Sequence, residues 1–246
     1  MAYINGREVL FSPQVNYGFE EGRQKEWSDF WDVFQDRGNR RDYVRAFQIG
    51  WNNETFKPKH DIVVINAEGM FYNIKIIGNF KELLESCGVV LDTRNATSMY
   101  QAFNNCTSIT HLPEISFESC TYSDQRTQLV FSGCYELVSI DKVIYPTDTY
   151  RPTTNTFQSC RKLTHIRIGG VIGNNFNISW SPLDVESVKD VILHLKDYST
   201  DTENKGKYTL TLSDTSKIAM AELGAIEEFN NKTYDEYLAD IGWRLE

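Results

Sequence analysis

The sequence predicts an α/β fold of stacked repeats with short parallel strands, flanked by a different module at each end. A pattern of Phe, Cys and two Leu or Ile residues begins at Phe103, Phe131 and Phe157, so that it recurs after 28 and then 26 residues. Periods of about 20 to 29 residues are typical of leucine-rich-repeat solenoids. The two ends of the chain lack this pattern. We therefore divide the chain into an N-terminal docking or capping module (1–60), a leucine-rich-repeat solenoid (61–180) and a C-terminal α/β cap (181–246).

The N-terminal module combines a hairpin with an aromatic helix. Asn5-Gly6 lies between two apolar runs and predicts a β-hairpin, because both residues tolerate the positive φ of its turn. From Tyr17 the pattern is helical, and we expect this helix to end near Gly38. Its aromatic side chains fall on one face, at Trp27, Phe30, Trp31 and Phe34. Two roles stay open for them: packing on the first repeat, or docking into another chain, since aromatic residues are enriched at interfaces.

Each repeat unit predicts a short helical turn ending in Phe, a Cys at a tight corner, and a short strand. One unit cannot bury its apolar face alone, so stability comes from stacking several units. A weaker copy, with Leu84, Cys87 and Val90, precedes the three clear ones, and the β-branched run after Asp61 predicts a strand. We interpret the repeated cysteines as small buried packing residues, because the CxxC spacing of a metal site is absent.

The C-terminal cap predicts two helices, a strand between them and a last helix. Ser181-Pro182 has the form of an N-cap followed by Pro at the first helical position. The buried face of that helix is predicted at Val185, Val188, Ile192 and Leu195. Apolar and polar residues then alternate from Tyr208 to Leu212, as in a half-buried strand. Helices follow over 217–229 and from Thr233 to Ile241, where Gly242 ends the chain's last helix.

Composition excludes several classes of function. The 246 residues include 25 basic and 34 acidic side chains, a formal charge of −9, which disfavours nucleic acid as a partner. No run of about 18 apolar residues is present, so we expect no membrane insertion. The first residues lack the pattern of a signal peptide, and we expect synthesis and folding in the cytoplasm. Five cysteines, an odd number, fit poorly with a complete disulfide framework.

No catalytic or cofactor motif is found, and we predict no enzyme activity, no cofactor and no metal. The glycines from Gly169 to Gly173 lack phosphate-loop spacing and predict a turn. The acidic cluster from Asp197 to Asn204 resembles a calcium loop only loosely, because Lys205 stands where an oxygen ligand is needed. Outward strand positions form the candidate binding face, and solvated strand residues are the alternative interpretation: Thr110, His111, Ser139, Thr164 and His165.

The Phe-x-x-Cys-x-x-Leu-x-x-Ile units resemble the BspA-type leucine-rich repeats found in bacterial surface proteins and in bacteriophage or prophage proteins. The stretches 3–13, 22–32 and 56–61 are similar to segments of leucine-rich-repeat proteins encoded by phages and prophages of gut bacteria. So are Ser181-Pro182-Leu183 and Leu210-Thr211-Leu212-Ser213. Surface adhesins of the same repeat class carry export signals and many more units, so the phage relatives are the better match.

This resemblance implies a non-enzymatic, virion-associated protein of the tail, the baseplate or the capsid surface. Its repeats are then a scaffold for host attachment that binds a host surface protein or glycan. The N-terminal module docks to other phage structural proteins, and a homo-oligomer is a further expectation. The alternative is a non-virion phage protein that binds a host factor inside the infected cell.

Overall fold

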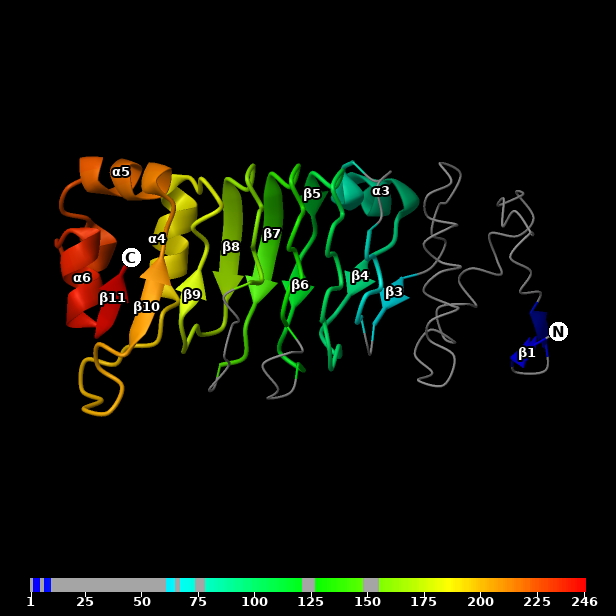
Figure 1. Ribbon diagram of the computed structural model, residues 1–246, viewed down its shortest axis with the longest axis horizontal. Helices are drawn as coiled ribbons and strands as arrows, with labels where there is room; N and C mark the ends of the chain where they lie inside the picture. The colour runs from blue at the N-terminus through cyan, green and yellow to red at the C-terminus, as the bar shows by residue number, and fades with distance from the viewer. Residues whose placement is uncertain are drawn as a thin grey trace.

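The computed structural model describes residues 2–4, 7–9, 61–64, 67–73, 78–120, 127–147 and 155–246. Within these ranges the chain is mixed α/β, with short, mostly parallel strands and no closed barrel. Figure 1 shows the strands from β3 to β9 following one another along the long axis of the molecule, with the helices α4, α5 and α6 at the C-terminal end. The helix expected over 17–38 lies outside the described residues, and the boundaries near 60 and 180 stay predictions.

The predicted N-terminal hairpin is confirmed. Strand β1 (Ala2–Ile4) pairs antiparallel with strand β2 (Arg7–Val9), and Ile4 lies opposite Arg7. This register leaves residues 5 and 6 as the connection. Asn-Gly is the dipeptide that such a two-residue connection favours, because both turn positions need a positive φ.

Parallel strands connect one repeat to the next. Strand β3 (Ile62–Val63) pairs with β4 (Leu91–Asp92), which confirms the strand expected after Asp61. In the next sheet, β7 is paired with β5 and β6 on one side and with β8 on the other. The bounds are β5 (His111–Leu112), β6 (Ile115–Ser116), β7 (Ser139–Ile144) and β8 (His165–Gly169). Ile140 of β7 pairs with Ile166 of β8, and Val143 pairs with Ile168. Between these two pairs β7 is one residue longer than β8, and a β-bulge accommodates the extra residue.

The segment around each repeated Phe is a turn, so the predicted helical turn is wrong. Two of the repeats have left-handed residues on both sides of the Phe: Gln101 and Asn105 around Phe103, and Leu129 and Gly133 around Phe131. A residue with positive φ cannot continue a right-handed helix. The turns also bond to one another, since the Phe103 amide donates to the Val130 carbonyl at 2.8 Å.

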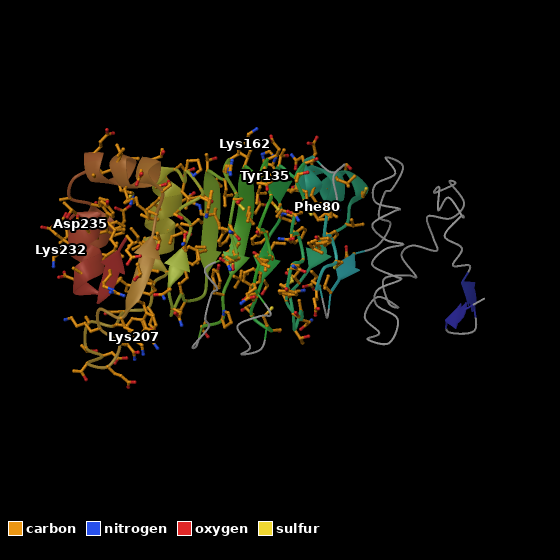
Figure 2. All side chains as sticks on the ribbon, in the orientation of Figure 1. Phe80, Tyr135, Lys162, Lys207, Lys232 and Asp235 are labelled. Carbon is orange, nitrogen blue, oxygen red and sulfur yellow. The ribbon has the colours of Figure 1, made fainter. Side chains whose placement is uncertain are left out.

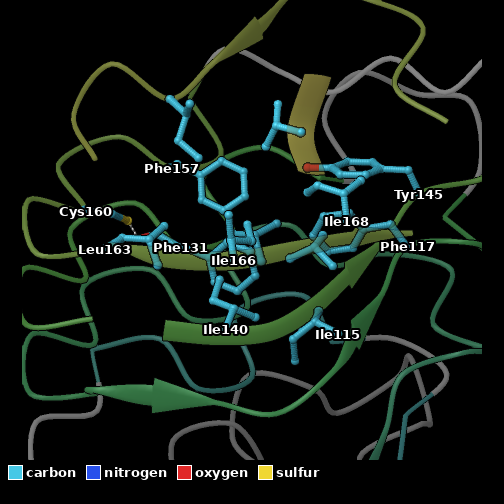
Figure 3. Close-up of a cluster of buried hydrophobic side chains, with 14 of the residues drawn as sticks. Ile115, Phe117, Phe131, Ile140, Tyr145, Phe157, Cys160, Leu163, Ile166 and Ile168 are labelled. Atoms are coloured by element: carbon cyan, nitrogen blue, oxygen red, sulfur yellow. Dashed lines mark hydrogen bonds between the residues drawn. The ribbon is translucent and has the colours of Figure 1, made fainter. Parts of the chain in front are cut away.

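The repeated Phe side chains form a continuous stack in the core. Phe71 and Phe103 are stacked with ring centroids 4.7 Å apart, and Phe131 lies 5.9 Å from Phe103 and 5.4 Å from Phe157. Figure 3 shows Phe131 and Phe157 beside the buried Ile140 and Ile166 of the strands. Burying a Phe side chain stabilises a fold by about 1.5–3 kcal/mol, and an aromatic pair adds about 0.5–1.5 kcal/mol.

The repeated cysteines are buried packing residues, as predicted, and they also donate hydrogen bonds. We call them the ladder cysteines: Cys106, Cys134 and Cys160. Each thiol donates to the carbonyl of the Phe one repeat earlier, at Phe71 (2.8 Å), Phe103 (3.1 Å) and Phe131 (3.1 Å). Cys120 makes a similar bond to Ala96, at 3.2 Å. The thiols are additional donors at Phe103 and Phe131, whose carbonyls also accept from the amides of Cys106 and Cys134 at 3.1 Å.

The weaker copy assigned to Leu84, Cys87 and Val90 is wrong. Leu84 and Cys87 belong to helix α3 (Phe80–Cys87), and Val90 is 58% exposed. The Phe that precedes Phe103 in the stack is Phe71, because it accepts the hydrogen bond of Cys106. Helix α3 is therefore an insertion within the repeat. It begins at Asn79, whose side chain caps the Glu82 amide, and it ends at Gly88 in the left-handed conformation.

The C-terminal region has the predicted kinds of element with different boundaries. Helix α4 (Val185–Leu193) is capped by Asp184, not by Ser181, whose buried hydroxyl donates to the Cys160 carbonyl at 3.2 Å. The helix expected over 217–229 ends earlier, because Gly224 turns the chain at a φ of 66°. The remaining elements are β9 (Phe176–Asn177), β10 (Tyr208–Thr211), α5 (Asp214–Glu222), the 3-10 helix η1 (Glu227–Phe229), α6 (Tyr234–Asp240) and β11 (Trp243–Leu245). Strands β9, β10 and β11 form a third parallel sheet, with β10 in the middle.

Helix α4 closes the open edge of strand β8. The Ile166 amide donates to the Ser187 hydroxyl at 3.0 Å, and the Ile168 amide donates to the Asp190 carboxylate at 2.6 Å. Two side chains of a helix therefore replace the backbone carbonyls of a further strand. An uncovered strand edge invites pairing with other chains, and this arrangement removes that exposure.

Candidate functional site

The residues proposed for the candidate binding face lie on or directly before three adjacent strands. His111 of β5 lies opposite Ser139 of β7, and Ser139 lies opposite His165 of β8. Thr110 and Thr164 precede the two histidines. Neighbouring strands are about 4.8 Å apart, so these side chains form a closely spaced row. We call the five residues the strand row: Thr110, His111, Ser139, Thr164 and His165.

Backbone hydrogen bonds fix the strand row at the point where each repeat enters its strand. The Thr110 carbonyl accepts from the amides of Val138 (2.7 Å) and Ser139 (3.2 Å). One repeat later, the Val138 carbonyl accepts from Thr164 (3.0 Å) and His165 (3.1 Å). The same geometry therefore recurs between successive repeats. The residues that follow His111, Ser139 and His165 are fully buried, at Leu112, Ile140 and Ile166, while the row residues are half-buried.

The histidine at each end of the row has a polar contact through its Nδ1 atom. His165 Nδ1 lies 3.1 Å from the Asp184 carboxylate, which also accepts a hydrogen bond from the Ser187 amide at 2.7 Å. Burial opposes the charge of Asp184, but the hydrogen bonds from Ser187 and the contact with His165 outweigh it, so the pKa of Asp184 lies below its ordinary value. At the other end, His111 Nδ1 is 2.8 Å from the Thr110 hydroxyl.

An open groove of about 340 Å³ lies next to the strand row, between helix α3 and the β5–β6 connection. Charged side chains line much of it. Lys81 of α3 reaches across to Asp141 of β7, at 2.9 Å, and Arg94 pairs with Asp92 at 2.6 Å. The hydrogen bond from Arg94 holds the pKa of Asp92 below its ordinary value. These charges already have partners, so the groove offers polar contacts without an unpaired charge at these positions.

The other predicted sites have different outcomes. The aromatic docking residues lie outside the described part of the chain: Trp27, Phe30, Trp31 and Phe34.

Among the described residues no group of three or more His, Cys, Asp or Glu side chains is placed to hold a metal ion. The Asp201 carboxylate accepts from the amides of Glu203 (3.0 Å) and Asn204 (3.1 Å) and so caps its own turn. No helix in the described ranges is both long and apolar enough to cross a bilayer.

Sequence reasoning missed one group of exposed residues, which we call the corner strip: Tyr135, Arg161 and Trp180. The Arg161 guanidinium carbon lies 5.9 Å from the ring centre of Tyr135 and 5.6 Å from that of Trp180. Figure 2 shows Tyr135 and Lys162, the neighbour of Arg161, at the same edge of the stack. Tyr135 and Arg161 each follow a ladder cysteine, so aligning the repeats could have found these two. Trp180 lies outside the repeated pattern.

The chain was compared with protein-family models, curated proteins and solved structures, and no match was found in any of the three.

Proposed function

We propose that this protein is a non-enzymatic phage protein, associated with the virion at the tail, the baseplate or the capsid surface. In this proposal its repeats form a BspA-type leucine-rich-repeat solenoid that serves as a protein- or glycan-binding scaffold for host contact. The observation that carries the proposal is the strand row, in which His111, Ser139 and His165 lie in register across adjacent strands.

The division of labour along each strand supports a binding role. The core is maintained by the buried neighbours Leu112, Ile140 and Ile166. The row residues do not belong to this buried core, so they can change identity at a smaller cost to the fold than the buried residues beside them. A surface built in this way retains its shape while its chemistry varies, as a host-binding surface requires.

The N-terminal module supplies the virion contact in this proposal. Trp27, Phe30, Trp31 and Phe34 fall on one helical face in sequence and provide large apolar area for docking to other phage structural proteins. The repeats then point away from the particle. A homo-oligomer on a symmetric virion site belongs to the same proposal.

Binding to cells of the host bacterium tests the strand row. Ser139 is the middle residue of the row, and Ser139→Arg places a long charged side chain between the two histidines. We expect fluorescently labelled full-length protein to bind host cells, and Ser139→Arg to weaken this binding at least about tenfold, the effect of losing about 1.4 kcal/mol. Ser199→Arg is the matched control, because Ser199 is also half-buried but lies in a turn of the C-terminal region.

Equal cell binding by wild type, Ser139→Arg and Ser199→Arg would show that the strand row is not the contact surface. If the protein binds no host cells, is absent from particles and captures a host protein from infected cells, the function is the intracellular alternative instead. Thermal unfolding monitored by circular dichroism verifies that both variants are folded.

A further inference from the structure

The corner strip has an unusual guanidinium at its centre. Arg161 is exposed, and within the described residues its guanidinium makes no ion pair and no hydrogen bond, only the two ring contacts. Its neighbour Lys162 does have a partner, since the Lys162 ammonium lies 2.5 Å from Glu136. An excess of acidic side chains gives the chain a formal charge of −9, yet no described carboxylate neutralises Arg161.

The two rings prepare Arg161 for binding. An Arg side chain carries about 2 kcal/mol of rotamer entropy, and its cation–π contacts with the two rings restrict it before any ligand arrives. The N–H donors of the guanidinium stay available, because no described group accepts a hydrogen bond from them. This planar fork matches a carboxylate, with which it forms two parallel hydrogen bonds.

The rings also provide surface for a ligand. Tyr135 is 43% exposed and Trp180 is 46% exposed. Aromatic faces carry negative charge density and attract polarised C–H groups. A ligand that uses the whole strip therefore needs a carboxylate fixed directly to a ring that carries C–H groups.

We propose that the corner strip binds an acidic sugar, a sialic or uronic acid residue of a host glycan. Arg161 pairs with the sugar carboxylate, and Tyr135 and Trp180 contact the C–H groups of the sugar. This inference rests on the proposed function. It adds the class of ligand and a second contact surface in addition to the strand row. An acidic peptide fits less well, because its carboxylates are on flexible chains that bring no rigid ring to the two aromatic side chains.

Titration with defined oligosaccharides tests the inference on the full-length chain. The probes are sialyllactose and a glucuronic acid disaccharide, with lactose and the corresponding glucose disaccharide as neutral counterparts, followed by ligand-observed NMR at about 0.15 M ionic strength. We expect each acidic sugar to bind more tightly than its neutral counterpart. Arg161→Lys keeps the charge but loses the fork, and should weaken acidic-sugar binding at least about tenfold. Trp180→Ala should weaken it as well.

Arg244→Lys is the control. Arg244 is an exposed arginine in the C-terminal strand β11, and its guanidinium donates to the Lys207 carbonyl. It should leave the affinity unchanged. The inference is overturned if acidic and neutral sugars bind equally, if Arg161→Lys has no effect, or if a polyglutamate peptide binds and the sugars do not. If the sugars fail to bind while particles carry the protein and Ser139→Arg abolishes cell binding, only the sugar inference is wrong. If the sugars bind but particles lack the protein, only the virion role is wrong.

Discussion

Each ladder cysteine fills a small space in the core and donates a hydrogen bond to the previous repeat. Cys134 is fully buried, and its thiol bonds to the Phe103 carbonyl at 3.1 Å. A hydroxyl or an apolar side chain could meet only one of these needs well, because a hydroxyl is costly to bury without good geometry and a methyl group donates nothing. This explains why the same residue type recurs at Cys106, Cys134 and Cys160.

Cys134→Ala should therefore destabilise the protein. We expect the free energy of unfolding to fall by about 1–3 kcal/mol, because the Phe103 carbonyl loses one of its two donors, keeping only the Cys106 amide, and a small cavity forms. Equilibrium unfolding in urea measures this change. Cys87→Ala is the matched control, since Cys87 is only half-buried, in α3, and should cost under about 1 kcal/mol. Equal losses for the two variants would contradict the role of the ladder.

Asp184 gives the C-terminal side of the strand row a dependence on pH. Because its pKa is lowered in the folded state, its stabilising contribution is present above its ordinary value of 3.8 and is lost as the pH falls through the folded-state value. Asp184→Ala should cost about 1–2 kcal/mol near neutral pH, through loss of the helix cap. The difference from wild type should shrink below about pH 4.

Ser213→Ala is the control for this pH dependence. Ser213 caps helix α5, and its hydroxyl accepts from the Ser216 amide at 3.2 Å without carrying an ionisable group. Its cost should stay constant between neutral and acidic pH. Urea unfolding of both variants from pH 7 to pH 3 makes the comparison, and parallel curves for Asp184→Ala and Ser213→Ala would contradict the account.

At the scale of elements, helix α4 ends the sheet by supplying side-chain acceptors to strand β8. Removing an acceptor there leaves a buried amide without a partner. Asp190→Ala should lower the free energy of unfolding by about 1–3 kcal/mol, because the Ile168 amide then has no acceptor. Asp190→Asn keeps an oxygen in place and should recover most of the loss. Chemical unfolding of the two variants tests this, and an equally damaging Asn substitution would show that charge, not the hydrogen bond, stabilises the edge.

The turn after β8 requires glycine because of crowding. A Cβ atom on Gly170 would lie 1.7 Å from the Tyr145 carbonyl oxygen, and the residue has a φ of 73°. Gly206 has nearly the same φ, 71°, but nothing within 4 Å of a Cβ position. Gly206→Ala should thus cost about 1–2 kcal/mol from backbone conformation alone. Gly170→Ala should cost clearly more, by about 3 kcal/mol or more. Thermal melts that rank the two variants equally would contradict this explanation.

Element-level predictions succeeded where one local rule decides the structure. The hairpin of β1 and β2, the strand after Asp61 and the last helix, predicted from Thr233 to Ile241, follow from turn, strand and capping preferences. They failed where a neighbouring segment decides. Ser181 resembles an N-cap in sequence, but its hydroxyl is buried against the Cys160 carbonyl, and Asp184 starts the helix instead.

For the whole molecule, periodicity located the core and part of the candidate site. The repeated pattern identified the buried Phe and Cys positions and the strand row, because each of these residues occupies an equivalent position in successive repeats. It could not identify contacts between repeats of unequal length. The pairing of Ile168 with Asp190, and of Arg161 with Trp180, depends on how the last repeat meets the C-terminal cap, and Trp180 has no equivalent in the other repeats.

Mass spectrometry of particles purified from an induced or infected host culture can show whether this chain is part of the virion. We expect this chain in washed particles at a constant ratio to the other structural proteins, because a symmetric site on the virion is occupied by a fixed number of copies. Its absence from particles, together with abundance in the infected cell, would contradict the virion role and favour an intracellular host-binding protein.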